Sequence, residues 1–426
     1  MKIHIKNGRL IDPKNNIDAR HDVFIAAGKV VGIGQAPADF TANQTIDASN
    51  SIVTPGFVDL SARLREPGAQ YKASLKSELQ AAAAGGITSL ACPPDTTPIL
   101  DEPGLVEMLK HRAKLLNLAN VYPLGALTQQ LQGKLLTEMH ALTEAGCVGF
   151  SQADNAVTDT QVLWRAFEYA ATFNYTLFLC AEDFYLAKDG VAHDGEVASR
   201  LGLKGIPAAA EALSIATILR IASQTKTRIH LCRLSTAEGV DLVRQAKKQG
   251  VQVTADVSAQ HCHLSEIDIG FFNTHANLKP PLRANRDRSA LCLGLKDGTI
   301  DAICSDHTPV DDDAKLLPFA EAEAGATSLE LLLPLTLKWA TENKASLLQG
   351  IAKITSQPAA ILGIAAGDLS VNNNADLAIF NPDIEWKVAA ETLKSAGKNT
   401  PFLGINMLGQ LQYTLLNGHI SYQHNA

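Results

Sequence analysis

The stretch TPGFVDLSARLREPG, residues 54–68, predicts a buried strand with polar residues at its carboxyl end. An apolar run bounded by a Pro-Gly turn signal is typical of such a strand. Seven more apolar runs follow, and a segment of helical character comes after each of them. They lie at residues 86–94, 120–128, 147–154, 176–183, 228–235, 251–258 and 299–307. Eight strands that alternate with helices predict an α/β fold, a closed (β/α)8 TIM barrel.

The segments on either side of this barrel have a different pattern. Residues 1–54 contain short runs separated by turns, which is typical of antiparallel strands. After Gly363 the chain returns to such strands, which are joined by Asn and Gly turns. We therefore expect a barrel over residues 55–364 and one small β domain, which residues 1–54 and 365–426 build together.

The composition and the net charge indicate which kinds of partner to expect. The 426 residues are 46% hydrophobic and 19% charged, as in soluble globular proteins. A net charge of −7 gives no electrostatic reason to expect nucleic acid or an acidic membrane surface as a partner. The N-terminus MKIHIKNGRLID predicts a strand and not a signal peptide, and no apolar run approaches the roughly 20 residues of a membrane span. Seven cysteines without CxxC spacing predict reduced thiols in a cytoplasm.

Several long stretches resemble the cyclic amidohydrolases, and within them the dihydroorotases, in the order found in that family. They include PGFVDLSARLREPG (55–68), AAAAGGITSLACPPDTTP (81–98), VTADVSAQH (253–261), GTIDAICSDHTP (298–309) and KNTPFLG (398–404). The resemblance extends over nearly the full length. It implies an amidohydrolase-type (β/α)8 barrel with a small β-sandwich from both termini, which agrees with the strand pattern.

The resemblance also implies where a metal site would lie. The positions that match the family's divalent-metal ligands are Ser61, Arg63, Ala153, Cys180, Arg233 and Asp306, of which only Asp306 keeps the family residue. A zinc site of a hydrolase needs about three N, O or thiolate ligands. A guanidinium 4 Å from another unit positive charge is repelled by roughly 4 kcal/mol at an effective dielectric of 20. We therefore expect no metal, with zinc lost relative to the family, and no catalytic residue, with Asp306 as a vestige.

The positions that match the family's substrate site are changed as well. Arg65 keeps the family arginine, but Asp95 and Lys279 stand where the family has asparagines that hold the substrate carboxylate. A carboxylate at a carboxylate-binding site adds repulsion, which Lys279 could offset. Arg65, Lys279 and Arg283 therefore leave open an anion site for a ligand such as orotate.

Two alternatives remain open for the arginines at the strand ends. In the first, Arg63 or Arg233, or both, pair with Asp306 and with Glu182 or Asp154, so that internal cations replace the metal ion. This is our hypothesis, because a buried carboxylate without a partner is costly. In the second, the arginines turn outward into a solvated barrel mouth.

The resemblance implies a specific biological role. We expect a catalytically inactive dihydroorotase homologue that acts as a structural, non-catalytic subunit of an aspartate carbamoyltransferase complex in pyrimidine biosynthesis. Its expected partner is the carbamoyltransferase catalytic chain, in the cytoplasm, with a homodimer inside the larger hetero-oligomer as one arrangement. The alternative is a divergent amidohydrolase that hydrolyses a cyclic amide through a reduced or rebuilt metal site, for example one built from Cys180, Asp306 and His307.

Overall fold

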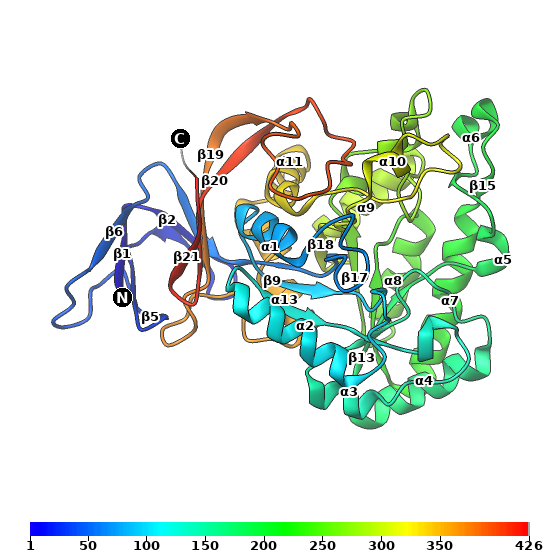
Figure 1. Cartoon of the computed structure of the whole chain (residues 1–426), viewed down its shortest axis with the longest axis horizontal. Helices are drawn as coiled ribbons and strands as arrows, with labels where there is room; N and C mark the ends of the chain where they lie inside the picture. Colours follow the sequence, from blue (N-terminus) through cyan, green and yellow to red (C-terminus); the bar gives the residue numbers. More distant parts are fainter. Residues whose placement is uncertain (425–426) are drawn as a thin grey trace.

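The structure, a computed structural model, describes residues 1–424 (Figure 1). A small β domain stands beside a barrel, and strands from both ends of the chain lie together in the β domain, blue beside orange and red in the figure. No helix within the described residues is both long and apolar enough to cross a membrane.

The β domain contains two sheets. The strand order is β5-β4-β1-β6 in one sheet and β21-β20-β19-β7-β2-β3 in the other. The strands are β1 (Lys2–Lys6), β2 (Arg9–Asp12), β3 (Ile17–Arg20), β4 (Val23–Ala26), β5 (Lys29–Ile33), β6 (Gln44–Asp47), β7 (Ile52–Pro55), β19 (Leu377–Lys387), β20 (Asn406–Leu416) and β21 (His419–Gln423). The antiparallel pair β7·β19 sets Pro55 opposite Leu377, so the C-terminal strands pair with the strand that leads into the barrel. Buried apolar side chains of both chain ends, among them Ile5 and Leu415, form one core between the sheets.

Each of the eight apolar runs of the sequence contains at least one strand of the barrel. The barrel strands are β8 (Phe57–Asp59), β9 (Ile87–Cys92), β10 (Asn120–Pro123), β11 (Gly125–Ala126), β12 (Phe150–Ser151), β13 (Thr176–Cys180), β16 (Arg228–Cys232), β17 (Val253–Ser258) and β18 (Ala302–Cys304). The third run is divided into β10 and β11 at Leu124. Neighbouring strands pair in parallel. The predicted barrel with a sheet domain from both termini is therefore confirmed.

Helices surround the barrel (Figure 1). The main ones are α1 (Leu75–Ala84), α2 (Pro103–Leu116), α3 (Met139–Ala145), α4 (Thr160–Phe173), α7 (Ala208–Thr225), α8 (Ala237–Lys248), α9 (Asn285–Asp297), α11 (Leu332–Glu342), α12 (Leu347–Ala352) and α13 (Ser356–Leu362). Shorter elements lie in the loops: α5 (Phe184–Ala187), β14 (Ala192–His193), α6 (Glu196–Leu201), β15 (Gly205–Ile206) and α10 (Asp312–Lys315). Side-chain caps fix the starts of several helices: Ser74 accepts a hydrogen bond from the backbone of Ser77 at α1, and Thr236 from that of Gly239 at α8.

The barrel closes between the residues that follow its first and last strands. Ala62 bridges His307 in parallel. The backbone N–H of Arg63 donates to the His307 carbonyl at 2.9 Å, and that of His307 donates to the Ser61 carbonyl at 3.0 Å. This closure places Arg63, after β8, next to Asp306, after β18.

Candidate functional site

The site lies at the carboxyl ends of the barrel strands, where barrel enzymes carry their chemistry. Ser61 and Arg63 follow β8, Cys180 ends β13, and Arg233 follows β16. Four positions of this rim have a left-handed backbone without being glycine: Arg65 (φ 59°), Ala153 (φ 51°), Arg233 (φ 55°) and Asp306 (φ 48°). Such strained residues gather at functional sites. Left-handed backbone thus occurs both at Asp306, which keeps the family residue, and at Ala153 and Arg233, where the residue differs.

Arg63 is held by acidic groups from three loops. Its side chain is only 7% exposed. Nε donates to Asp95 Oδ2 at 2.7 Å and Nη2 to Asp154 Oδ2 at 2.7 Å. Nη1 donates to Thr308 Oγ1 at 3.1 Å and lies 3.7 Å from Asp306 Oδ1. The guanidinium thus points into the barrel mouth and not into solvent.

Arg233 makes a second set of contacts with the same carboxylates. Its side chain is 4% exposed, and Nη1 donates to Asp306 Oδ1 at 2.8 Å. Nη2 pairs with Asp154 and donates to Cys180 Sγ at 2.6 Å. The hypothesis that Arg63, Arg233 or both pair with Asp306 is confirmed, and both arginines do so. The second shared carboxylate is Asp154.

Glu182, the other carboxylate in that hypothesis, does not join this network. It lies 3.4 Å from Lys279 Nζ. The structure also adds a partner that the sequence reasoning missed, because Asp95 was interpreted only as a substrate-site residue. Asp95 and Arg63 form an ion pair. Both residues differ from those of the family and both follow neighbouring strands, and this joint change was the signal that could have revealed the pair.

The pKa values of the two shared carboxylates are shifted in opposite directions, because burial and the arginine charges compete with different outcomes. Burial alone would raise the pKa of Asp154, but the charges of Arg233 and Arg63 outweigh burial and hold that pKa well below its ordinary value. Burial raises the pKa of Asp306 above its ordinary value, against the attraction of the same two arginines. Asp154 is therefore the anion that anchors both guanidinium groups.

The six positions do not fit a divalent cation. Ala153 packs against Ala126 and Leu131, and an alanine offers no ligand. Asp306 and Cys180 are the residues among the six with strong zinc ligands, and Arg233 donates a hydrogen bond to Oδ1 of the first and to Sγ of the second. A metal ion at this place would meet the guanidinium groups of two buried arginines, which repel it.

Two other groups of possible metal ligands are already engaged in hydrogen bonds. His307, in the hypothesis of a rebuilt site, pairs through Nε2 with Glu78 at 2.6 Å and accepts through Nδ1 from the backbone of Ser328. One ligand atom each of His230, Cys232 and Asp256 lie within 4.8 Å of one another. Both ring nitrogens of His230 are already bonded, Nδ1 to Thr254 Oγ1 and Nε2 to Asp256 Oδ2, each at 2.9 Å. A metal ion in either place would have to displace these bonds.

The three basic residues considered for anion binding also have protein partners. Arg65 Nε donates to the Pro309 carbonyl at 2.7 Å. Lys279 Nζ donates to the Asp154 carbonyl at 3.3 Å. Arg283 Nη1 donates to the Ile206 carbonyl at 2.6 Å. An anion such as orotate would have to compete with these internal acceptors.

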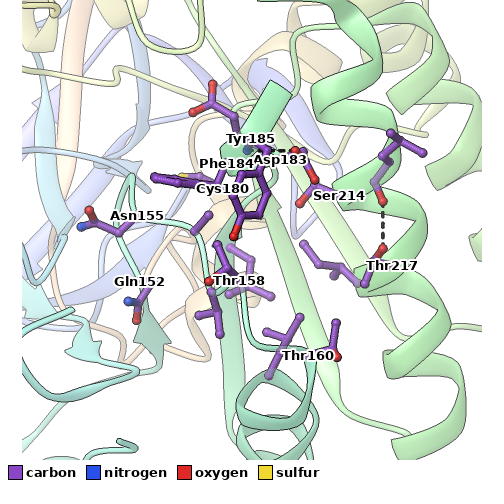
Figure 2. Close-up of a pocket in the computed structure, with 17 residues that line it drawn as sticks. Gln152, Asn155, Thr158, Thr160, Cys180, Asp183, Phe184, Tyr185, Ser214 and Thr217 are labelled. Carbon is purple, nitrogen blue, oxygen red and sulfur yellow. Dashed lines mark hydrogen bonds between the residues drawn. The ribbon is translucent and has the colours of Figure 1, made fainter. Parts of the chain in front are cut away.

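Two cavities open beside the network. One has a volume of about 670 Å³ and is lined by Asp154, Glu182, Lys279 and the short helix α5, among others. The other, of about 170 Å³, is lined by Gln152, Cys180 and Phe184, among others (Figure 2). The mouth therefore retains open space beside the two arginines that stand at positions matching metal ligands of the family.

Comparison with known proteins gives consistent relatives. Residues 50–239 match a family model described as dihydro-orotase-like. A "Dihydroorotase-like protein" of Pseudomonas aeruginosa is 42% identical, over 99% of this chain and 100% of its own. A "Dihydroorotase" of Geobacter sp. (strain M21) is 40% identical, over 99% of this chain and 100% of its own. Among solved structures, the L-hydantoinase (dihydropyrimidinase) from Arthrobacter aurescens superimposes with a TM-score of 0.88 at 25% identity, over 100% of this chain and 96% of that one.

Proposed function

This chain belongs to the dihydroorotase-like family, and we propose that it is a catalytically inactive member of it. In this proposal it is a structural, non-catalytic subunit of an aspartate carbamoyltransferase complex in pyrimidine biosynthesis, in the cytoplasm. The observation that carries the proposal is the pair of buried guanidinium groups, Arg63 and Arg233, at positions that match metal ligands of the family.

The chemistry of cyclic amide hydrolysis supports inactivity. The reaction needs a group that polarises the carbonyl, a water molecule that becomes a nucleophile, and a general base. Asp306 is the natural base, but its Oδ1 accepts from Arg233 and lies near Arg63. The oxygen that would take a proton from water is therefore already engaged by two fixed cations, and among the described residues no free metal ligand beside it is left to activate that water.

The partner in this proposal rests on the family resemblance, and an exposed apolar patch supports a protein contact. Phe271 is 90% exposed and Leu316 is 83% exposed. Their loops lie together, because Thr274 Oγ1 donates to the Lys315 carbonyl at 2.6 Å and Lys315 Nζ donates back to the Thr274 carbonyl at 3.0 Å. Large exposed apolar groups that gather at one place are typical of interaction surfaces. We call these two side chains, with the adjacent Phe272 and Leu317, the aromatic-leucine patch.

Co-expression with the carbamoyltransferase catalytic chain of the same organism tests the proposal. We expect one large complex in size-exclusion chromatography with light scattering. The double substitution Phe271→Ser with Leu316→Ser is expected to reduce co-elution if the patch forms the contact. Leu115→Ser, which changes a leucine that is 72% exposed on α2, is the matched control. A carbamoyltransferase that is fully assembled and stable without this chain would contradict the proposal.

The second candidate function is a divergent amidohydrolase. It is favoured by the relatives named dihydroorotase and by the retained Asp306. In this case the arginines would have to move away when a metal ion binds. Elemental analysis of the purified protein separates the candidates, because bound zinc at one or two ions per chain would favour the enzyme.

A further inference from the structure

Two cysteines lie directly beside each other at the barrel mouth. Cys180 and Cys232 are register partners on the parallel strands β13 and β16. Neighbouring strands are about 4.7–4.9 Å apart, and this spacing falls within the Cα separation of about 4.4–6.8 Å that a disulfide allows. Both thiols are free. The backbone thus sets them at a distance from which a disulfide can form.

The surroundings make these two sulfurs unequal. A hydrogen bond from the Cys232 thiol, together with the charge of Arg233, lowers the pKa of Cys180 in spite of burial and the nearby Asp154. The same hydrogen bond, together with burial and the charge of Asp256, raises the pKa of Cys232. The Arg233 Nη2 atom lies 2.6 Å from Cys180 Sγ. Cys180 is thus the sulfur that contacts the Arg233 cation, and it lines the 170 Å³ cavity whereas Cys232 does not, so Cys180 is the member that a small oxidant meets first.

Cys180 is also reachable. It lines the 170 Å³ cavity together with Gln152, Asp183 and Phe184, and its sulfur is drawn beside the Phe184 ring (Figure 2). Cys180 and Cys232 are the two cysteines with intermediate exposure, whereas the other five are buried. A molecule as small as hydrogen peroxide fits the space in front of the Cys180 sulfur.

We propose that Cys180 and Cys232 are a peroxide-reactive dithiol, which hydrogen peroxide converts to a disulfide. In the first step the Cys180 thiolate attacks one peroxide oxygen: an S–O bond forms, the O–O bond breaks, and the leaving hydroxide takes a proton to become water. The sulfur is oxidised by two electrons and the peroxide is reduced by two.

In the second step the Cys232 sulfur, after losing its proton to water, attacks the sulfenic sulfur of Cys180. The S–S bond forms, the S–O bond breaks, and hydroxide leaves and is protonated to a second water. A thiol such as dithiothreitol reverses the change by exchange. The disulfide removes the sulfur acceptor from Arg233, so oxidation also alters the arginine network. This inference goes beyond the proposed function and does not depend on it.

Peptide mapping of the full chain under non-reducing conditions tests the inference. The native protein is treated with hydrogen peroxide, free thiols are blocked, and the tryptic peptides are identified by mass spectrometry. We expect peptides that contain residues 180 and 232 to be linked, and to separate after dithiothreitol. The pair Cys262 and Cys292 is the internal control, because the Cys292 thiol donates to the Cys262 carbonyl at 3.4 Å, so the two residues are neighbours, but both thiols are buried. We expect linkage there to be slower by roughly tenfold or more.

Two variants identify the role of each sulfur. In Cys232→Ser, peroxide is expected to leave a sulfenic acid at residue 180, which dimedone labels. In Cys180→Ser, we expect no linkage or dimedone label at residue 232. The wild-type map does not depend on how well these variants fold. Cys180 and Cys232 that stay unlinked in the wild type, or that link no faster than Cys262 and Cys292, would overturn the inference.

Discussion

The substitution Arg233→Met tests how far the buried arginines hold the barrel mouth together. Methionine keeps much of the length of the side chain and removes the charge. Asp306 would then retain only Arg63, at 3.7 Å, and Asp154 would lose one of its two guanidinium partners. Removing one partner of a buried ion pair costs about 3–5 kcal/mol, because the remaining charge stays buried.

This cost translates into a melting shift. With an unfolding entropy of about 2.1 cal/mol/K per residue, the whole chain gives about 0.9 kcal/mol/K, so Tm should fall by about 3–6 °C in differential scanning calorimetry at pH 7. The matched control is Arg165→Met, which removes an exposed pair with Glu168. Exposed pairs contribute about 0–1 kcal/mol, so its Tm should change by about 1 °C or less.

A second substitution separates the ion pair from general packing loss. Asp306→Asn in the Arg233→Met background removes the carboxylate that the first change leaves with Arg63 as its one arginine partner. We expect the double variant to be more stable than the sum of the single effects, by about 0.5–3 kcal/mol. The reasoning is refuted if Arg233→Met melts like Arg165→Met, or if the two substitutions at the mouth add without interaction.

Three further substitutions test other parts of the structure. Burial raises the pKa of Asp59 to about 7, so between pH 4 and 7 this carboxyl is protonated in the folded chain and ionised in the unfolded chain. The free energy of unfolding of the wild type should therefore fall by up to about 4 kcal/mol relative to that of Asp59→Asn as the pH rises from 4 to 7. Urea denaturation at several pH values measures this difference, and a difference that does not change with pH would contradict the prediction. Buried Glu211 accepts hydrogen bonds from the backbone and hydroxyl groups of Ser235 and Thr236 before α8, so Glu211→Gln should cost about 1–3 kcal/mol; an unchanged urea midpoint would contradict that role. Gly325 has φ +136°, and an added Cβ would collide with the Thr308 side chain and lie 3.0 Å from the Thr308 carbonyl oxygen. Gly325→Ala should therefore lower Tm by several degrees. An unchanged Tm would contradict this close contact.

The fold could be predicted from the sequence because the barrel strands are apolar runs with turn signals between them. The division of the third strand at Leu124 could not, since periodicity does not show where pairing changes from one neighbour to the next. One β domain from both chain ends was predicted, but their pairing within one sheet and its register were not. The sheet register depends on contacts between segments more than 300 residues apart, such as Pro55 and Leu377.

The site was predictable in part. The resemblance placed Arg63, Arg233 and Asp306 at the strand ends of one barrel mouth, and charge balance then required carboxylate partners. Which carboxylate serves depends on backbone geometry that the sequence does not reveal. Ala153, just before Asp154, has φ 51° although it is not glycine, and propensity predicts no left-handed residue at an alanine. For this reason Asp154 and Glu182 could not be distinguished before the structure.

We propose above all that Arg63 and Arg233 stand in place of a metal ion and that this chain does not hydrolyse dihydroorotate. The most direct test is the rate of dihydroorotate hydrolysis by the purified protein, measured while zinc is titrated from none to excess. We predict the rate of protein-free buffer at every zinc concentration. Turnover that rises until about one or two zinc ions are bound per chain, and that is lost in Asp306→Asn, would contradict the claim.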